Sequence, residues 1–223
     1  MSRRSSAPEP HPVLALLPVA GGFVALAWLS LAVRDGGLVG FDREVLLLFR
    51  DPADPLYPLG PRWLESSVRD VTNLGGPALI SLVTAAAAGL FLLAGRAGDA
   101  VWLLAAVVGA FLISLGLKVG IARPGPAFLP HSVPTDPVAF PSGHATSAAA
   151  TYLTLGVLAA RGQARARARV YLRSLGVLLT LAIGLSRVYL GTHWPTDVLA
   201  GWILGASWAL SCWLVATRLE RGA

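Results

Sequence analysis

The sequence is short of charge, of lysine and of cysteine, and each shortage narrows what the protein can be. Only 13% of its 223 residues are charged, whereas a soluble domain carries about 25%. This shortage, together with 55% hydrophobic residues, argues against an ordinary soluble domain and indicates a membrane protein. The only cysteine, Cys212, lies in an apolar run and excludes an internal disulfide.

Positive charge in this chain is almost all arginine, because Lys118 is the only lysine, and the formal net charge is +6. In a membrane protein such an excess reports orientation and contact with lipid headgroups. We therefore expect membrane lipids, and not nucleic acid, as partners. No Cys/His cluster has the spacing of a zinc site, so we expect no metal and no other cofactor.

Apolar runs of helix length recur along the chain, each close to the roughly 20 residues that span a bilayer. They predict an all-α fold, a transmembrane bundle of six spans. The predicted spans are residues 12–33, 71–95, 100–117, 144–160, 170–189 and 198–217. A signal peptide is the alternative for the first run, but its apolar part is long for a signal core and no small-x-small cleavage site stands out.

The segment between the first two spans, residues 34–73, is mixed in charge, with seven acidic and five basic residues. Phe41–Phe49 and Trp63–Leu74 both have helical spacing of apolar residues, and prolines separate them. Because a spanning helix would have to bury several of these charges, short interfacial helices are favoured. A disordered loop is the alternative.

The distribution of arginine predicts the orientation in the membrane. Six spans put both chain ends on one side, which also receives the basic loop 161–169, so the positive-inside bias makes that side the cytoplasm. We expect a cytoplasmic tail at 1–11, a single cell-membrane (inner-membrane) domain at 12–217, and a second cytoplasmic tail at 218–223.

The stretch from Phe140 to His144 has the features of an anion site. Pro141 stops the incoming loop from being helical, and Ser142 is a typical N-cap for a helix that begins near Gly143. The first turn of a helix exposes unpaired N–H groups that bind anions, and His144 adds a titratable imidazole. Taken alone, the same stretch is equally typical of an ordinary capped helix.

The predicted topology gathers unusual polar residues at the outer membrane face. They come from the end of the third span, the start of the fourth, and the turn between the fifth and sixth. The set is Lys118, Arg123, Ser142, Gly143, His144, Ser186, Arg187, His193 and Asp197. Singly, the cations could extend to headgroups and Asp197 could be a helix cap. Their convergence instead favours a functional site, because ionisable groups at span ends are costly.

Two of these segments resemble a known family. Pro141-Ser142-Gly143-His144 and the run Ser-Arg-Val-Tyr-Leu-Gly-Thr-His-Trp-Pro-Thr-Asp at 186–197 are similar to two of the three signature motifs of the type 2 phosphatidic acid phosphatase superfamily. The resemblance covers about residues 75–215, and the six-span layout matches the integral-membrane branch. It implies a metal-independent phosphatase that acts on a lipid phosphate at the extracytoplasmic face. Phosphatidic acid, phosphatidylglycerophosphate and undecaprenyl pyrophosphate remain open as substrates.

The resemblance also implies a role for each site residue. His193 would attack phosphorus and form a phosphohistidine, and Asp197 would hold its other ring nitrogen. His144 would protonate the leaving group and then activate water. The implied phosphate ligands are Lys118, Arg123, Ser142, Gly143 and Arg187.

The first signature motif departs from the family pattern of lysine, six residues and Arg-Pro. After Lys118, the arginine position holds Gly125, while Arg123 lies two residues earlier. Either Arg123 takes over that phosphate contact or one contact is missing. Two alternatives to a hydrolase follow: a lipid-to-lipid phosphotransferase, and a catalytically weakened protein that binds or transports lipid phosphates. A haloperoxidase is disfavoured, because those relatives are soluble.

Overall fold

The structure, a computed structural model, describes residues 12–126 and 138–222, and within these ranges it is helical apart from turns and one isolated β-bridge between Arg50 and Pro58. In chain order the elements are α1 (Pro12–Arg34), α2 (Val39–Leu47), α3 (Arg62–Asn73), α4 (Pro77–Leu93), α5 (Ala97–Ile121), α6 (Gly143–Ala148), the π-helical turn η1 (Ala149–Leu153), α7 (Thr154–Arg161), α8 (Ala166–Tyr189) and α9 (Pro195–Gly222).

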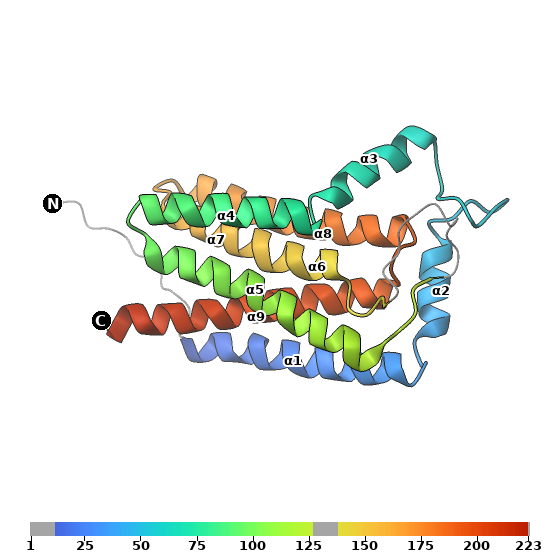
Figure 1. Cartoon of the computed structure of the whole chain (residues 1–223), viewed down its shortest axis with the longest axis horizontal. Helices are drawn as coiled ribbons and strands as arrows, with labels where there is room; N and C mark the ends of the chain where they lie inside the picture. Colours follow the sequence, from blue (N-terminus) through green and yellow to red (C-terminus); the bar gives the residue numbers. More distant parts are fainter. Residues whose placement is uncertain (1–11, 127–137, 223) are drawn as a thin grey trace.

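The long helices run side by side along one axis, and α2 and α3 lie at one end of the bundle (Figure 1). Helix α9 is central: it packs against α1, α5, α6 and α8. Helix α4 lies against α5, and α3 packs on α8. The all-α prediction is confirmed for the described residues.

Four helices of the described chain, α1, α5, α8 and α9, are long and apolar enough to cross a membrane. Helices α3 and α4 pass the same test only as one broken span, bent by 46°. The predicted fourth span corresponds to α6, η1 and α7, which follow one another without a gap from Gly143 to Arg161. The count of six spans stays a prediction.

The helix boundaries differ from the expected ones at several ends. Helix α5 extends beyond the expected residues 100–117 at both ends, and α8 begins at Ala166 where residue 170 was expected. The second predicted span begins at Val71, but in the structure helix α3 ends at Asn73 and a new helix, α4, begins at Pro77. Proline is favoured in the first turn of a helix, because its missing N–H is not needed there. Helix α9 continues to Gly222, through most of the predicted C-terminal tail. The predicted N-terminal tail lies outside the described residues. Helices α2 and α3 match the two short helices expected between the first two spans; their place at the membrane interface stays a prediction.

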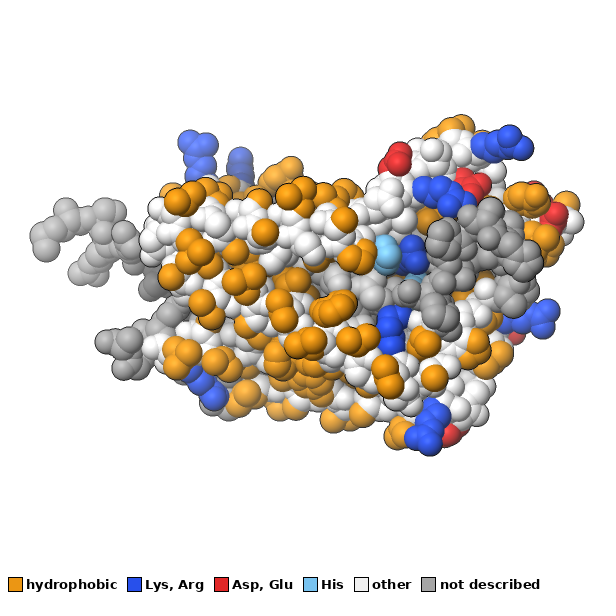
Figure 2. All heavy atoms as spheres, viewed as in Figure 1, with side chains coloured by type: hydrophobic (Ala, Val, Ile, Leu, Met, Phe, Trp, Pro, Cys, Tyr) orange, Lys and Arg blue, Asp and Glu red, His pale blue; other side chains and the backbone are white. Residues whose placement is uncertain are grey.

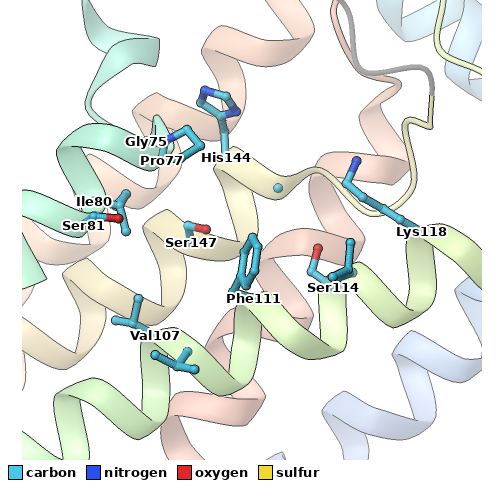
Figure 3. A pocket seen from close by; sticks show the side chains of 13 residues that line it. Gly75, Pro77, Ile80, Ser81, Val107, Phe111, Ser114, Lys118, His144 and Ser147 are labelled. Atoms are coloured by element: carbon cyan, nitrogen blue, oxygen red, sulfur yellow. The ribbon is translucent and has the colours of Figure 1, made fainter.

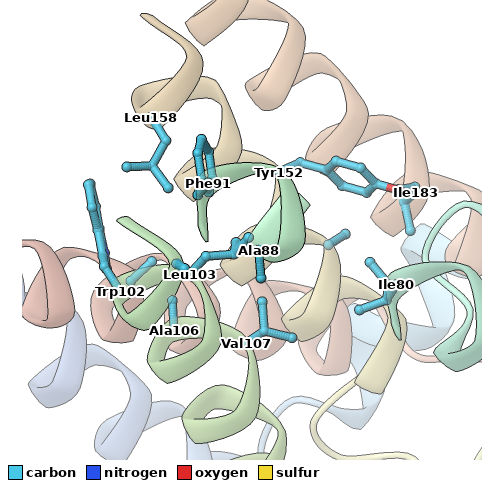
Figure 4. Packing of buried hydrophobic residues seen from close by; sticks show 13 residues of the cluster. Ile80, Ala88, Phe91, Trp102, Leu103, Ala106, Val107, Tyr152, Leu158 and Ile183 are labelled. Carbon is cyan, nitrogen blue, oxygen red and sulfur yellow. The ribbon is translucent and has the colours of Figure 1, made fainter. Parts of the chain in front are cut away.

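One of three buried hydrophobic clusters in the described chain lies between α4, α5, η1, α7 and α8 and includes residues of α6 and α9, and Figure 4 shows its packing. Leu103, Leu158 and Ile183 are fully buried there. Outside this core, large apolar side chains remain exposed, as Leu93 and Val119 are at 89% and 77%. Figure 2 shows apolar side chains spread over the sides of the bundle and charged ones mostly toward its ends. This distribution suits a bundle surrounded by lipid.

Two glycines of α9 bring its backbone against α6. A Cβ on Gly201 would lie 2.8 Å from the carbonyl oxygen of Ser142, and one on Gly205 would lie 2.5 Å from that of Thr146. Small residues four apart allow such close approach of membrane helices. The contact fixes the two helices that begin with the predicted site motifs relative to each other.

Candidate active site

The predicted site residues lie at the end of the bundle that carries α2 and α3. Lys118 is near the end of α5, His144 is in the first turn of α6, Arg187 is in the last turn of α8, and Asp197 is in the first turn of α9. His193 lies in the turn between α8 and α9. Because these helices alternate in direction, their relevant ends meet (Figure 1).

His193 is held in one orientation with one ring nitrogen left over. Its side chain is 1% exposed, and Nδ1 lies 2.9 Å from the carbonyl oxygen of Ala139. A carbonyl only accepts, so Nδ1 carries the proton of the neutral ring and Nε2 has the lone pair. Nε2 is buried and has no hydrogen-bond partner in the described part of the chain. The geometry therefore presents a neutral imidazole with a nucleophilic nitrogen.

The surroundings of His193 favour this neutral form. Burial lowers the pKa of His193 below its usual value, and the nearby cations Arg187 and Lys118 lower it further. Asp197 opposes these effects and raises the pKa, but the net shift is downward. The imidazole is thus uncharged at neutral pH, as a nucleophile must be.

Asp197 acts on His193 through charge rather than through a direct hydrogen bond. Its Oδ2 lies 3.8 Å from Nδ1 of His193, beyond hydrogen-bond distance, and accepts instead from the backbone N–H of Trp194 at 2.9 Å. Helix α9 starts at Pro195, so Asp197 is the third helical residue and reaches back to the N-cap residue. The direct contact that the resemblance implied is taken by the carbonyl of Ala139.

Arg123 lies beside Asp197 and joins it to a second carboxylate that the sequence analysis missed. Its Nη1 donates to Oδ1 of Asp197 at 2.7 Å and to Oγ1 of Thr196 at 2.8 Å. Its Nη2 donates to Oδ2 of Asp42 at 2.6 Å. Asp42, on α2, is fully buried and also accepts from the N–H and the hydroxyl of Thr196, at 2.9 and 2.6 Å. The one available signal was an acidic residue inside an apolar helical pattern.

Ser142 links the two signature motifs through its backbone and leaves its hydroxyl unused. Its N–H donates to the carbonyl of Asp197 at 2.9 Å, and its carbonyl accepts from the N–H of Thr146 at 3.0 Å. As predicted, it is the N-cap residue of α6, but its side chain makes no capping bond. The buried Oγ has no partner among the described residues. A bound ligand could supply one.

Lys118, Gly143 and His144 line one pocket of about 690 Å³ between α4, α5 and α6 (Figure 3). Nζ of Lys118 donates to the carbonyl of Val138 at 2.5 Å. A Cβ on Gly143 would lie 4.0 Å from Cε of Lys118, so the lysine passes close to the start of α6. The rest of the lining is largely apolar, with Ile80, Val107, Phe111 and Leu115.

Two arginines lie at the C-terminal end of α8: Arg187 belongs to its last turn, and Arg50 binds its last carbonyls. Arg187 is 8% exposed, and its Nη1 lies 3.4 Å from Oγ1 of Thr72. Arg50, from the segment after α2, donates through Nη2 to the carbonyls of Tyr189 and Val188. Gly191 follows with φ +70°, and a Cβ there would lie 2.8 Å from Nη2 of Arg50. The turn before His193 therefore requires glycine both for its conformation and for its closeness to Arg50.

The remaining sequence prediction concerns Gly125, in the loop after α5. Gly125, at the position of the family arginine, is described and lies between Pro124 and Pro126. Among the described residues, no group of three or more His, Cys, Asp or Glu side chains is placed to hold a metal ion.

Comparison with known proteins assigns the fold. The solved structure of a transmembrane PAP2-type phosphatidylglycerolphosphate phosphatase from Bacillus subtilis is similar, with a TM-score of 0.71 and 24% identity over 92% of this chain and 96% of that chain. The crystal structure of Aquifex aeolicus LpxE matches with a TM-score of 0.54 and 21% identity, over 81% of this chain and 94% of that one.

Curated sequences agree with the structural comparison. The chain is 33% identical to phosphatidylglycerophosphatase B of Bacillus subtilis over 147 residues, which are 64% of this chain and 70% of that protein. It is 37% identical to an undecaprenyl-diphosphatase of Sulfolobus acidocaldarius over 83 residues, only 35% of that protein. Residues 99–221, more than half of the chain and including both motifs at the site, match the PAP2 superfamily. The chain is a multi-pass membrane protein and belongs to the PAP2 superfamily.

Proposed function

We propose that this protein is a membrane phosphatase that hydrolyses the phosphate ester or diphosphate of a lipid. One observation carries the proposal: the buried neutral imidazole of His193 keeps Nε2 without a partner in the described chain, beside the cations Arg187 and Lys118. A nucleophilic nitrogen and two fixed positive charges are what phosphoryl transfer requires. The relatives are a phosphatidylglycerophosphatase B and an undecaprenyl-diphosphatase, and the names of both indicate a lipid phosphate as substrate.

In the first step, Nε2 of His193 attacks phosphorus, a P–N bond forms, and the P–O bond to the leaving group breaks. His144 gives its proton to the departing oxygen. Lys118, Arg187, the hydroxyl of Ser142 and the N–H of Gly143 stabilise the charge on the remaining phosphoryl oxygens. In the second step His144 takes a proton from water, which attacks phosphorus, and the P–N bond breaks to release phosphate. Lys118 and Arg187 supply the positive charge that stabilises the transition state, so the proposal requires no metal.

The role of Arg123 in this proposal differs from the phosphate contact expected from the sequence. Its two terminal nitrogens are bound to Asp42, Thr196 and Asp197. We assign it to holding Asp197, which in turn stabilises the imidazolium-like charge on His193 during phosphoryl transfer. The contact that the family arginine makes is then absent at Gly125.

The pocket between α4 and α5 supports a lipid substrate. It carries Lys118 and His144 at one end and apolar side chains such as Val107 and Phe111 along its walls. A phosphate on a hydrocarbon tail fits that order, because the charged headgroup meets the cations and the tail stays in apolar surroundings. In the proposed topology of six spans with cytoplasmic termini, the site faces the extracytoplasmic side.

The test is phosphate release by detergent-purified full-length protein with chelator present. We expect the wild type to release phosphate from phosphatidic acid, and His193→Ala to lower kcat at least about 1,000-fold while the protein still folds, as a thermal unfolding transition shows. Acid quenching should trap a phosphorylated wild-type protein whose P–N bond is labile to acid and stable to base. Turnover by His193→Ala at the wild-type rate would remove the phosphohistidine step. Phosphate found on an added acceptor lipid instead of in solution would identify a transferase, and binding without turnover would identify the transport alternative.

A further inference from the structure

Three serine hydroxyls line the pocket just below the proposed phosphate site. Ser81 comes from α4, Ser114 from α5 and Ser147 from α6, and Figure 3 shows them around the same cavity as Lys118 and His144. Within the described part of the chain, none of the three hydroxyls forms a hydrogen bond. Three separate helices therefore each direct one hydroxyl to a shared space.

Two serines outside the pocket bond within their own helix, whereas the hydroxyls of Thr84, Thr151 and Thr154 are buried without a partner among the described residues. Ser30 donates to the carbonyl of Leu26 at 2.7 Å, and Ser211 donates to the carbonyl of Ser207 at 2.8 Å. Such a bond to the preceding turn of the same helix is the usual way to satisfy a hydroxyl in apolar surroundings. The pocket hydroxyls do not make this bond and line the space that a ligand would fill.

The three hydroxyls lie at a similar depth. Ser114 is four residues before Lys118 on α5, Ser147 is three residues after His144 on α6, and Ser81 is four residues after Pro77, the first residue of α4. At a rise of 1.5 Å per residue, these spacings correspond to about 4.5–6 Å along the three helix axes. Beyond them the walls are apolar. The pocket therefore presents a cationic mouth, then hydroxyl donors, then hydrocarbon-like walls.

A diacylglycerol phosphate carries its groups in the same order. Its phosphate is followed within a few covalent bonds by two ester carbonyls, which accept hydrogen bonds, and then by two hydrocarbon chains. A polyprenyl phosphate has no acceptor at that depth, so it would leave the hydroxyls unpaired against hydrocarbon. A site built to hydrogen-bond a substrate group discriminates against an analogue that lacks the group.

We propose that this pocket selects glycerolipid phosphates over polyprenyl phosphates, with Ser81, Ser114 and Ser147 donating hydrogen bonds to the ester carbonyls. The inference rests on the proposed phosphatase function and names the substrate class for the same site. It assigns the three serines to substrate recognition and leaves the bond-breaking steps to the residues already described.

The test compares three substrates in mixed micelles: phosphatidic acid, its dialkyl ether analogue without carbonyls, and a polyprenyl phosphate. We expect wild-type kcat/KM to be about tenfold higher for the ester than for the ether, as loss of one or two hydrogen bonds implies. The triple variant Ser81→Ala/Ser114→Ala/Ser147→Ala should lose that preference, by a fall of about tenfold on the ester with little change on the ether. Ser211→Ala, which removes a hydroxyl bonded within its own helix, is the matched control and should keep the wild-type ratio.

Two results would overturn the inference and leave the phosphatase proposal intact. One is equal loss on ester and ether substrates in the triple variant, and the other is a higher wild-type kcat/KM for the polyprenyl phosphate. Failure of the proposed function gives a different result: no phosphate is released from any of the three substrates, and the question of preference does not arise.

Discussion

The guanidinium of Arg123 forms a buried ion pair with the carboxylate of Asp42, at 2.6 Å between Nη2 and Oδ2. The same guanidinium contacts Asp197 at 2.7 Å. Asp42 belongs to α2, between the first two long helices, whereas Asp197 opens the last helix. A short helix outside the signature motifs thus supports the residue next to the proposed nucleophile. The site depends on a segment that no motif marks.

Asp42→Asn should therefore lower the catalytic rate without weakening substrate binding. The substitution leaves Arg123 with one carboxylate fewer and loosens the placement of Asp197, so we expect kcat to fall at least about tenfold while KM changes little. Glu44→Gln removes an exposed carboxylate from the same helix and serves as the control. Steady-state phosphate release measures both parameters, and a thermal unfolding curve in detergent separates loss of activity from loss of fold.

A double-mutant cycle shows whether Asp42 and Arg123 act as one unit. If they do, Asp42→Asn combined with Arg123→Gln should cost little more than Arg123→Gln alone. Additive losses, or a rise in KM caused only by the arginine substitution, would instead indicate that Arg123 binds the substrate phosphate.

The pH dependence of activity should report the neutral form of His193. Burial and neighbouring cations lower its pKa, so the acid limb of kcat/KM should lie below the usual histidine value of about 6.5. Asp197→Asn removes the influence that raises this pKa, and the limb should move to still lower pH in any residual activity. A pH–rate profile of both proteins checks the shift. An acid limb at or above the usual value would contradict the buried neutral imidazole.

The same shift has a consequence for stability with a defined sign. The folded state binds a proton at His193 less readily than the unfolded state does. Protonation of this histidine therefore leaves the free energy of unfolding constant above a pH of about 6.5 and lowers it as the pH falls below that value. His193→Gln should reduce this loss of stability in acid, as measured by thermal unfolding from pH 7 down to pH 5.

The sequence predicted those parts of the protein that depend on local pattern. Apolar runs located the long helices, and the residue spacing in the segments 140–144 and 186–197 pointed to His144, His193 and Asp197, whose catalytic roles stay predictions. The carbonyl of Ala139 could not be found this way, because any residue supplies a backbone carbonyl and only the fold decides which one meets Nδ1 of His193. Asp42, the ion-pair partner of Arg123, could not be predicted for a similar reason.

Arg123 illustrates how tertiary contacts redirect a residue that a motif seems to assign. In the sequence it is the one arginine near the expected position, and either it makes the phosphate contact or one contact is missing. In the fold, Asp42 arrives from 81 residues away and takes up one of its terminal nitrogens. Such a distant pairing leaves no periodic trace along the chain, whereas the spacing of a helix face does.

The close packing of α6 against α9 should be sensitive to a single methyl group. In Gly201→Ala the new Cβ would lie 2.8 Å from the carbonyl oxygen of Ser142, so the helices must separate. We expect a loss of about 1–3 kcal/mol in stability, as overpacking causes, together with reduced activity. Gly116→Ala on α5 is the control, because nothing lies within 4 Å of its added Cβ, and it should be neutral or slightly stabilising. Thermal unfolding and phosphate release of the two variants decide the matter, and equal behaviour would contradict the proposed close contact.

Restoring the family arginine at position 125 tests whether this chain lacks a phosphate contact. Arg123 is bound to two carboxylates, so Gly125→Arg would add a cation at the position of the family arginine, and kcat/KM on phosphatidic acid should rise about tenfold. Gly125→Gln has similar reach without the charge and should not produce the gain. An equal effect of both substitutions would attribute the change to loop stiffening, because both replace glycine. A gain confined to arginine, and lost on raising the salt concentration, would identify a charge that acts on the substrate.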